Sequence, residues 1–164
     1  MADDVNRRVQ KIVADVPSIQ ARVGSSEVRS IPKPSGHAST NPSTGRITVN
    51  SNWASGVTDK RLQATMYHES IHVQQLDQGM SGKEHRSVME FHAHNRELRH
   101  AMKHDLYSPQ DLQGKLQKIN KYGAAVKKAF PAFTDNVDRQ LDRIGKGEQP
   151  AKHSVSYWTK KLGK

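Results

Sequence analysis

The sequence predicts an α+β domain that is mostly helical, with a small antiparallel β-hairpin or sheet packed beside one central helix. Apolar residues recur at helical spacing over most of the chain, and only three short stretches have strand character. The 164 residues match the length of one ordinary domain, and a hydrophobic content of 34% allows only a small core. We therefore expect a single domain over residues 1–164, with a motif-bearing core at about 36–104 and a helical, basic C-terminal part at 105–164.

The N-terminal part of the chain is expected to begin with two helices. Apolar residues spaced three and four apart predict a helix over residues 3–16. Pro17 opens a second, short helical segment that ends near Gly24. Residues 27–31 predict a strand, because the two prolines that follow would stop it.

A β-hairpin follows this first strand. Its arms are residues 37–40 and 46–50, and its turn is residues 41–45. The turn contains a proline that fixes φ and a glycine that accepts positive φ. We expect the two arms to pair antiparallel.

Four longer helices are predicted after the hairpin, and capping residues mark where they begin. Thr58 is the N-cap of the first, Ser81 and Glu84 have the spacing of a capping box, and Ser108 precedes a proline at a first helical position. The predicted helices cover residues 58–78, 81–104, 109–130 and 134–144. The last twenty residues, around Trp158, are expected to form a loosely ordered tail that docks by its aromatic side chains.

The charge of the chain is positive and uneven. Lys and Arg number 26 and Asp and Glu number 16, which gives a net charge of +10. Residues 1–82 carry a net charge of +2, whereas residues 83–164 carry +8. A surface of this sign attracts nucleic acid, anionic lipid or an acidic protein, or serves as a solvated face.

The chain has no cysteine, which excludes disulfides and thiolate-based metal sites. Seven of the nine histidines fall between His68 and His104, so histidine and carboxylate are the ligands left for a metal. The N-terminus leads into no apolar segment of a signal peptide, and no stretch is long enough to span a bilayer. We therefore expect a protein made soluble in the cytoplasm without a signal peptide or transmembrane segment, and exported, if at all, by a specialised secretion system.

The segment that carries chemistry reads Tyr67-His68-Glu69-Ser70-Ile71-His72 and contains the pattern H-E-x-x-H. Positions i and i+4 of a helix share one face, so the imidazoles of His68 and His72 can reach one ion. Glu69 lies about 100° further around the helix, where its carboxylate can touch a metal-bound water without binding the metal. The alternative is a solvent-facing histidine pair with an ion-pairing glutamate.

Zinc needs a third protein ligand, and the next predicted helix offers candidates. Glu90, His94 and Glu97 lie at positions i, i+4 and i+7 of one face. Glu90 is the first choice; His94 and Glu97 then orient the ligand histidines, or one of them replaces Glu90. In the alternative interpretation all three are ordinary surface residues.

The other histidines of this helix are expected to be bystanders. On a helical wheel His92 points away from the Glu90 face, and we expect it to face solvent. We expect His85, His100 and His104 to be surface residues, with His100 the one able to lean over a cleft.

On these residues the chain resembles the zincin metallopeptidases, in which H-E-x-x-H on a central helix supplies two zinc ligands and the catalytic glutamate. Glu90, eighteen residues beyond His72, fits the glutamate-ligand branch called gluzincins; the metzincin branch requires Gly and His where this chain has Gln75 and Gln78. The continuation Val-Gln-Gln, the small size and the upstream hairpin are similar to compact bacterial metallopeptidase domains of polymorphic toxins and secreted effectors. The resemblance covers about residues 36–104.

The resemblance implies a zinc-dependent peptidase of endopeptidase type. Zn²⁺ would activate a water, and Glu69 would take the water's proton as general base. The oxyanion needs a hydrogen-bond donor, for which Tyr107, Tyr122 and His100 are candidates. An extended substrate would lie beside an edge strand, which by its position resembles residues 46–50.

Two other functions are compatible with the sequence. One is a basic nucleic-acid-binding or nuclease domain, which the charge of residues 83–164 and the histidine-rich helix favour, although no nucleic-acid-binding signature is present. The other is an inactive zincin-like binding module. The partners expected for the leading hypothesis are a protein or peptide substrate and a cognate immunity or inhibitor protein or the secretion apparatus.

Overall fold

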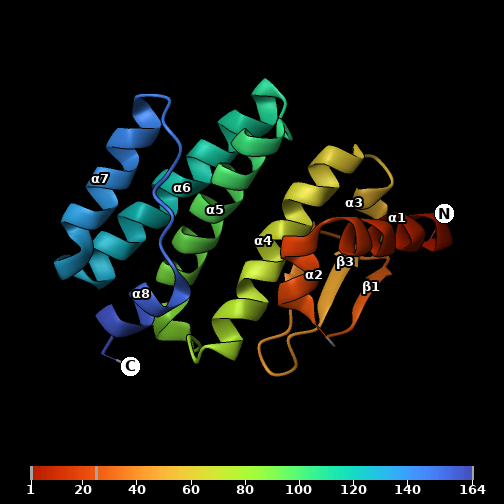
Figure 1. Cartoon of the computed structure of the whole chain (residues 1–164), viewed down its shortest axis with the longest axis horizontal. Helices are drawn as coiled ribbons and strands as arrows, with labels where there is room; N and C mark the ends of the chain where they lie inside the picture. The colour runs from red at the N-terminus through yellow and green to blue at the C-terminus, as the bar shows by residue number, and fades with distance from the viewer. Residues whose placement is uncertain (1, 25, 164) are drawn as a thin grey trace. The chain divides into compact units, whose positions relative to one another are not determined.

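The computed structural model describes residues 2–24 and 26–163. Its chain divides into two compact units, Met1–Asp77 and Gln78–Lys164. The first unit combines helices with a small sheet, and the described part of the second is helical (Figure 1). The mostly helical α+β class predicted from the sequence is therefore confirmed. Among the helices of residues 2–24 and 26–163, none has both the length and the apolar character needed to cross a bilayer.

The described part of the first unit consists of helices and short strands, and all of them except the short helix at 51–54, which is not predicted, lie close to their predicted positions. The helices are α1 (Ala2–Asp15), α2 (Pro17–Val23), α3 (Ser51–Ala54) and α4 (Asp59–Asp77), and the strands are β1 (Val28–Ile31), β2 (Ala38–Thr40) and β3 (Ile47–Asn50). Helix α1 packs against β1 and α4, and α2 packs against α4. Thr58 is the N-cap of α4, since its Oγ1 accepts the N–H of Arg61 at 3.2 Å. The predicted long helix with the H-E-x-x-H pattern is thus α4.

The three strands form one sheet in the order β1-β3-β2. The predicted hairpin is confirmed, because β2 and β3 pair antiparallel, but β1 joins on the other side of β3 and runs parallel to it. The sheet is therefore mixed, and β3 is its central strand. Ile47 and Val49 of β3 are both fully buried, which explains why this strand occupies the centre. The prediction that residues 46–50 form the edge is wrong; β2 and β1 are the edge strands.

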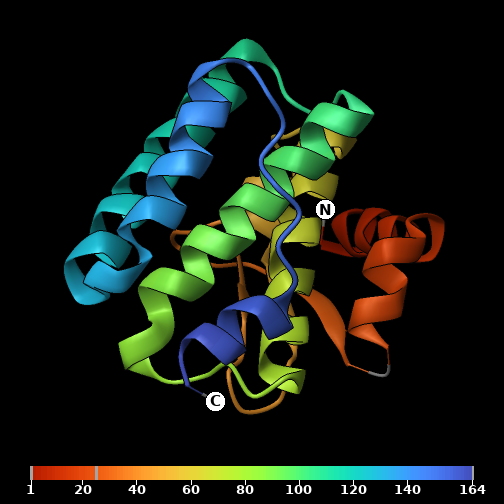
Figure 2. The ribbon, with the colours of Figure 1, turned by 60° about the vertical axis from the view of Figure 1, so that its left-hand side comes forward.

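The described part of the second unit is built on two long helices and a shorter third one. Its elements are η1 (Lys83–His85), α5 (Arg86–His104), α6 (Pro109–Ala129), η2 (Pro131–Phe133), α7 (Thr134–Gly145) and α8 (Val155–Lys161). Helix α6 packs against α5 on one side and α7 on the other (Figure 2). A capping box of Ser108 and Asp111 begins α6, with the Asp111 N–H donating to Ser108 Oγ at 3.2 Å.

The start of α5 differs from the prediction. Ser81 and Glu84 form no capping box, because Gly82 has a φ of 102° and separates Ser81 from the helix. The chain makes the short turn η1 first, and α5 begins at Arg86 without a side-chain cap. The Ser81 carbonyl instead accepts the Nδ1–H of His85 at 2.8 Å.

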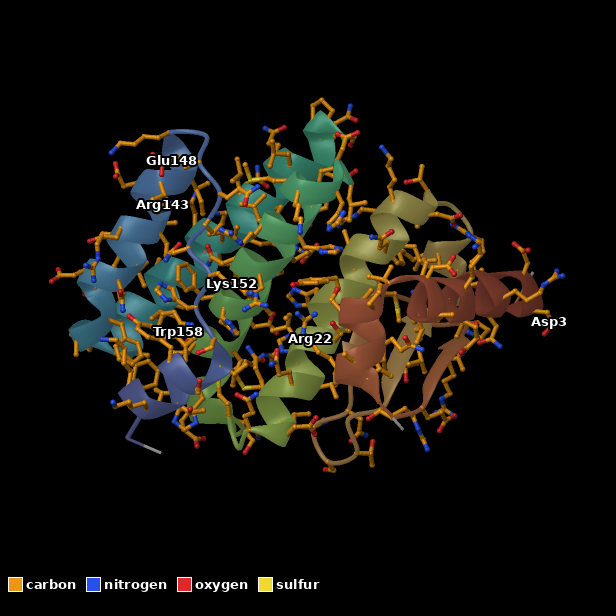
Figure 3. All side chains as sticks on the ribbon, viewed as in Figure 1. Asp3, Arg22, Arg143, Glu148, Lys152 and Trp158 are labelled. Atoms are coloured by element: carbon orange, nitrogen blue, oxygen red, sulfur yellow. The ribbon has the colours of Figure 1, made fainter. Side chains whose placement is uncertain are left out.

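The C-terminal residues are more ordered than predicted. They form α8, and the side chain of Trp158 is 1% exposed in the core of the second unit (Figure 3). The segment before α8 runs along α5 (Figure 2), where Arg96 donates to the carbonyl of His153 at 3.0 Å and Arg99 to that of Pro150 at 2.8 Å. Docking through an aromatic side chain is thus confirmed, and the loosely ordered tail is wrong.

The three longer helices of the second unit approach closely at one glycine. A Cβ atom on Gly123 of α6 would lie 3.0 Å from Val137 Cγ1 on α7 and 3.2 Å from Phe91 Cε2 on α5. Gly123 is buried in the helix interior, where glycine is otherwise unfavourable. The glycine therefore allows α6 to pack closely against both neighbours.

Candidate functional site

The two histidines of the H-E-x-x-H pattern lie side by side on α4. Their Nε2 atoms are 3.0 Å apart, and the ring planes cross at 82°. Two nitrogens at zinc-ligand distance around a tetrahedral ion would be about 3.3 Å apart. The spacing between His68 and His72 is therefore close to what one shared ion needs.

Gln75, one turn further along α4, holds the ring of His72. Its Oε1 lies 2.7 Å from His72 Nδ1, and an amide oxygen can only accept, so Nδ1 carries the proton. The Nε2 atom of His72 is then left with its lone pair. Gln75 is fully buried, so the amide that holds the His72 ring is itself shielded from solvent. Sequence reasoning used Gln75 only to exclude the metzincins; its position three residues after a ligand histidine was the signal for this role.

Glu69 is held by the edge strand β2. Thr40 Oγ1 lies 2.7 Å from Glu69 Oε2 and 3.1 Å from the Glu69 carbonyl oxygen, so the hydroxyl donates to the carboxylate or shares its proton between both. This contact fixes the side chain of the proposed general base relative to α4. It joins residues 29 positions apart, and nothing in the local pattern around Thr40 predicts it.

Arg22 of α2 forms hydrogen bonds to several residues of α4. Its guanidinium donates to Gln74 Oε1 at 3.2 Å, to Ser70 Oγ at 3.3 Å and to the Tyr67 hydroxyl at 3.1 Å. It also lies 4.6 Å from the centroid of the Tyr67 ring. A planar cation with several donors thus fixes the rotation of the helix that carries His68 and His72.

The three ligand candidates of the second unit are neighbours on α5, as predicted. His94 Nε2 lies 3.7 Å from Glu90 Oε2, and His94 Nδ1 lies 3.5 Å from Glu97 Oε2. His94 and Glu97 are buried, so the alternative interpretation as surface residues is wrong for these two.

A lysine that sequence reasoning missed enters this group from α6. Lys115 is buried, its Nζ lies 2.8 Å from His94 Nδ1, and it forms an ion pair with Glu97. The Tyr107 hydroxyl donates to the other oxygen of Glu97. A lysine among several in a basic helix gives no local signal of such a role; only its place on the buried face of α6 distinguishes it.

The candidate oxyanion donors lie in different surroundings. Tyr107 is bound to Glu97, and the ring of Tyr122 stacks on His94 with centroids 5.3 Å apart. Burial, and secondly the charge of Glu90, raise the pKa of Tyr122, so its hydroxyl keeps its proton at neutral pH. His100 lies beside His104, with ring centroids 4.5 Å apart. Their role as donors to a substrate stays a prediction.

Three histidines differ from the sequence prediction. His92 is buried rather than solvent-facing, and its Nε2–H donates to the His153 carbonyl at 3.0 Å. His85 and His100 are buried as well, whereas His104 is exposed as predicted. The wheel places His92 correctly away from Glu90, but that side of α5 is covered by the C-terminal segment, which the sequence did not place.

Within the described ranges 2–24 and 26–163, the residues that could hold a metal ion are His68 and His72 in the first unit and Glu90, His94 and Glu97 in the second. No family model matches the chain, and neither a curated protein nor a solved structure does.

Proposed function

We propose that the chain is a zinc-dependent peptidase in which His68 and His72 supply two ligands and Glu69 is the general base. The observation that carries the proposal is the pair of Nε2 atoms 3.0 Å apart on α4. Gln75 fixes the tautomer that leaves Nε2 of His72 able to bind an ion, and Thr40 fixes the adjacent carboxylate.

The donor set fits zinc. Imidazole nitrogens suit Zn²⁺, a carboxylate can complete the protein ligands, and the chain has no thiolate to compete for a softer ion. The third ligand is proposed to be Glu90, with His94 and Glu97 as the alternatives. When bound, zinc supplies a Lewis acid that polarises the scissile carbonyl and lowers the pKa of a water to about 7.

The chain's own residues account for the movement of the proton. Glu69 accepts it from the attacking water and returns it to the leaving amine. The Thr40 hydroxyl binds Glu69 Oε2, which leaves Oε1 as the atom that takes the proton. Because Thr40 belongs to β2, the edge strand also brings its backbone next to the general base. We propose that an extended peptide substrate lies along this strand, with its backbone rather than its side chains recognised.

The test is a metal and activity comparison of the wild type with Glu69→Gln. Glu69→Gln should keep stoichiometric zinc and lose about 10²–10⁴-fold in kcat on an unfolded protein substrate, the usual contribution of a general base. Glu84→Gln, which neutralises an exposed glutamate, is the matched control and should leave both unchanged. A purified wild type without zinc, or unchanged proteolysis by Glu69→Gln, would refute the proposal.

The wider biological setting is proposed from the resemblance alone. A bacterial effector or toxin would need a cognate immunity or inhibitor protein in the producing cell. A comparison of the proteomes of cells carrying the wild type and of cells carrying Glu69→Gln should then reveal new peptide termini in the wild-type cells. If the protein instead shows salt-dependent DNA binding and no new termini, the nucleic-acid alternative is favoured.

A further inference from the structure

We propose that the outer face of α6 binds the backbone of a duplex nucleic acid without reading its sequence. The surface lies wholly within the second unit and shares no residue with the groups proposed to hold zinc, so it does not rest on the peptidase function. We call it the lysine face, and its exposed residues are Gln113, Gln117, Lys118, Lys121, Ala124 and Lys128.

The three lysines of this face form a row along α6. With 100° and a rise of 1.5 Å per residue, Lys118, Lys121 and Lys128 lie within about 80° of one another and span about 15 Å. Ile119 and Val126 point about 140° away from the row, and both are buried in the core of the second unit. The packing that buries one side of α6 therefore leaves the lysines at the surface.

No carboxylate of the described chain neutralises the row. Between Asp111, which caps α6, and Asp135 the sequence has no acidic residue. In the part of the second unit that the structure describes, the three lysines form no ion pair, whereas the neighbouring Lys127 pairs with Asp138 of α7 at 2.8 Å. The charge of the lysine face is therefore directed to an anion outside the chain.

The neutral residues of the lysine face favour a phosphate backbone over other anionic partners. The amides of Gln113 and Gln117 can donate to phosphate oxygens, and the small Ala124 allows a close approach. A protein interface is typically poor in lysine and rich in aromatic anchors, and a membrane-bound helix needs large apolar residues. The six residues of the face include neither aromatic nor large apolar side chains.

The same composition favours a duplex over a single strand. Proteins bind single strands by stacking aromatic side chains on the bases, and a duplex encloses its bases. Double-stranded DNA carries one negative charge per about 1.7 Å of its axis, so about nine phosphates lie along the 15 Å that the lysines span. Each phosphate contact contributes about −0.9 to the slope of log K against log salt concentration, so three lysines predict about −2.7.

The test is binding of a fluorescein-labelled DNA duplex of about 20 base pairs to the full chain, followed by anisotropy between about 50 and 200 mM NaCl. The triple variant Lys118→Gln/Lys121→Gln/Lys128→Gln should make the slope less negative by about 2.7 and raise the Kd at about 100 mM NaCl more than tenfold. The single variant Lys121→Gln should change the slope by about 0.9. All three positions are exposed, so the variants should unfold at the temperature of the wild type.

The matched control removes the same charge from other elements of the second unit. Lys83→Gln/Lys152→Gln/Lys160→Gln replaces three exposed lysines outside α6 and should change the slope by less than half as much. If the control changes the slope as much as the α6 variant does, the binding is spread over the unit and its assignment to the lysine face is wrong.

The remaining outcomes test the choice of partner. A wild type that binds no duplex at about 50 mM NaCl overturns the proposal. Equally tight binding, through the same lysines, to oligothymidylate, to polyglutamate or to vesicles of phosphatidylcholine and phosphatidylserine shows that the duplex is the wrong partner. Since no variant alters a proposed zinc ligand or Glu69, either result leaves the zinc function standing, and a protein without zinc leaves the lysine face standing.

Discussion

The two units hold similar side chains by different means. On α4 the histidine pair and Glu69 are supported by neutral groups, the amide of Gln75 and the hydroxyl of Thr40. On α5 the corresponding support is the charged Lys115. Neutral partners leave the charge of a carboxylate unchanged, whereas an ammonium neutralises it. The chemical role of a buried His–Glu group therefore depends on its partners. The neutral partners on α4 suit a ligand pair and a general base, whereas the charged partner on α5 suits a structural role.

The largest effect on stability should come from breaking the ion pair between Lys115 and Glu97. Lys115→Met removes the ammonium that pairs with the buried carboxylate of Glu97, and it should lower the free energy of unfolding of the second unit by about 3–5 kcal/mol. Urea unfolding at pH 7, followed by Trp158 fluorescence in a Trp53→Phe background, measures it. Lys115→Met/Glu97→Gln should recover most of the loss because no charge stays unpaired. A loss below about 1 kcal/mol for the single variant would show that the pair is not buried.

Loss of Gln75, the neutral partner of His72, should change the free energy of unfolding less and the zinc affinity more. Gln75→Met removes the acceptor of His72 Nδ1–H and should weaken zinc binding about 10–100-fold. Gln75→Glu, which still offers an oxygen, should retain more of the affinity than Gln75→Met does. The matched control is Gln78→Met, because Gln78 is exposed. Equal affinities of Gln75→Met and the wild type would mean that the tautomer of His72 is set elsewhere.

The same contrast explains what the sequence could predict. The pairing of His68 with His72 follows from i, i+4 geometry within one helix, so a local pattern was sufficient. The contacts of Thr40 and Lys115 join residues 29 and 18 to 21 positions apart. No periodicity within one segment encodes such a contact, because it depends on how two elements pack.

The errors in the fold have the same physical origin. The hairpin β2–β3 was predicted from its turn, but the parallel pairing of β1 with β3 depends on a long-range register. His92 was placed on the correct side of α5, yet its burial depends on the C-terminal segment that crosses there. The capping box predicted at Ser81 is the exception, because it is prevented by a local feature, the positive φ of Gly82.

The third prediction concerns the pH dependence of the stability of the second unit. Burial, then the nearby charges of Arg139 and Lys161, lower the pKa of His153 below 6.5. Its Nε2 accepts from the Gln140 amide, whose oxygen is taken by the Ala151 N–H, so the amide cannot turn to suit a protonated ring. The unfolded chain therefore binds more protons below pH 6.5, and this stabilisation is present above 6.5 and lost as the pH falls through the folded pKa.

The expected result is that the second unit loses stability between pH 7.5 and 5.5 in the wild type. His153→Gln should reduce this loss, and His104→Gln, which changes an exposed histidine, should not. The measurement is the midpoint of thermal unfolding followed by Trp158 fluorescence in a Trp53→Phe background. An unchanged pH dependence in His153→Gln would assign the titration to another group.

The smallest effect tests the packing that brings α6 close enough for Lys115 to reach α5. Gly114→Ala, at an exposed helical position with no atom near the new Cβ, should raise the free energy of unfolding by about 0.5–1 kcal/mol. Gly123→Ala gains the same helix propensity, but its Cβ would press on Val137 and Phe91, so a net loss of about 1 kcal/mol is expected.

Urea unfolding of both variants gives the difference directly, since the two glycines lie in the same helix and only their surroundings differ. If Gly123→Ala were as stabilising as Gly114→Ala, α6 could move away from its neighbours without cost. The contact of Lys115 with His94 and Glu97 would then depend on the ion pair alone, and a large loss in Lys115→Met would have to be attributed to charge without any contribution from enforced packing.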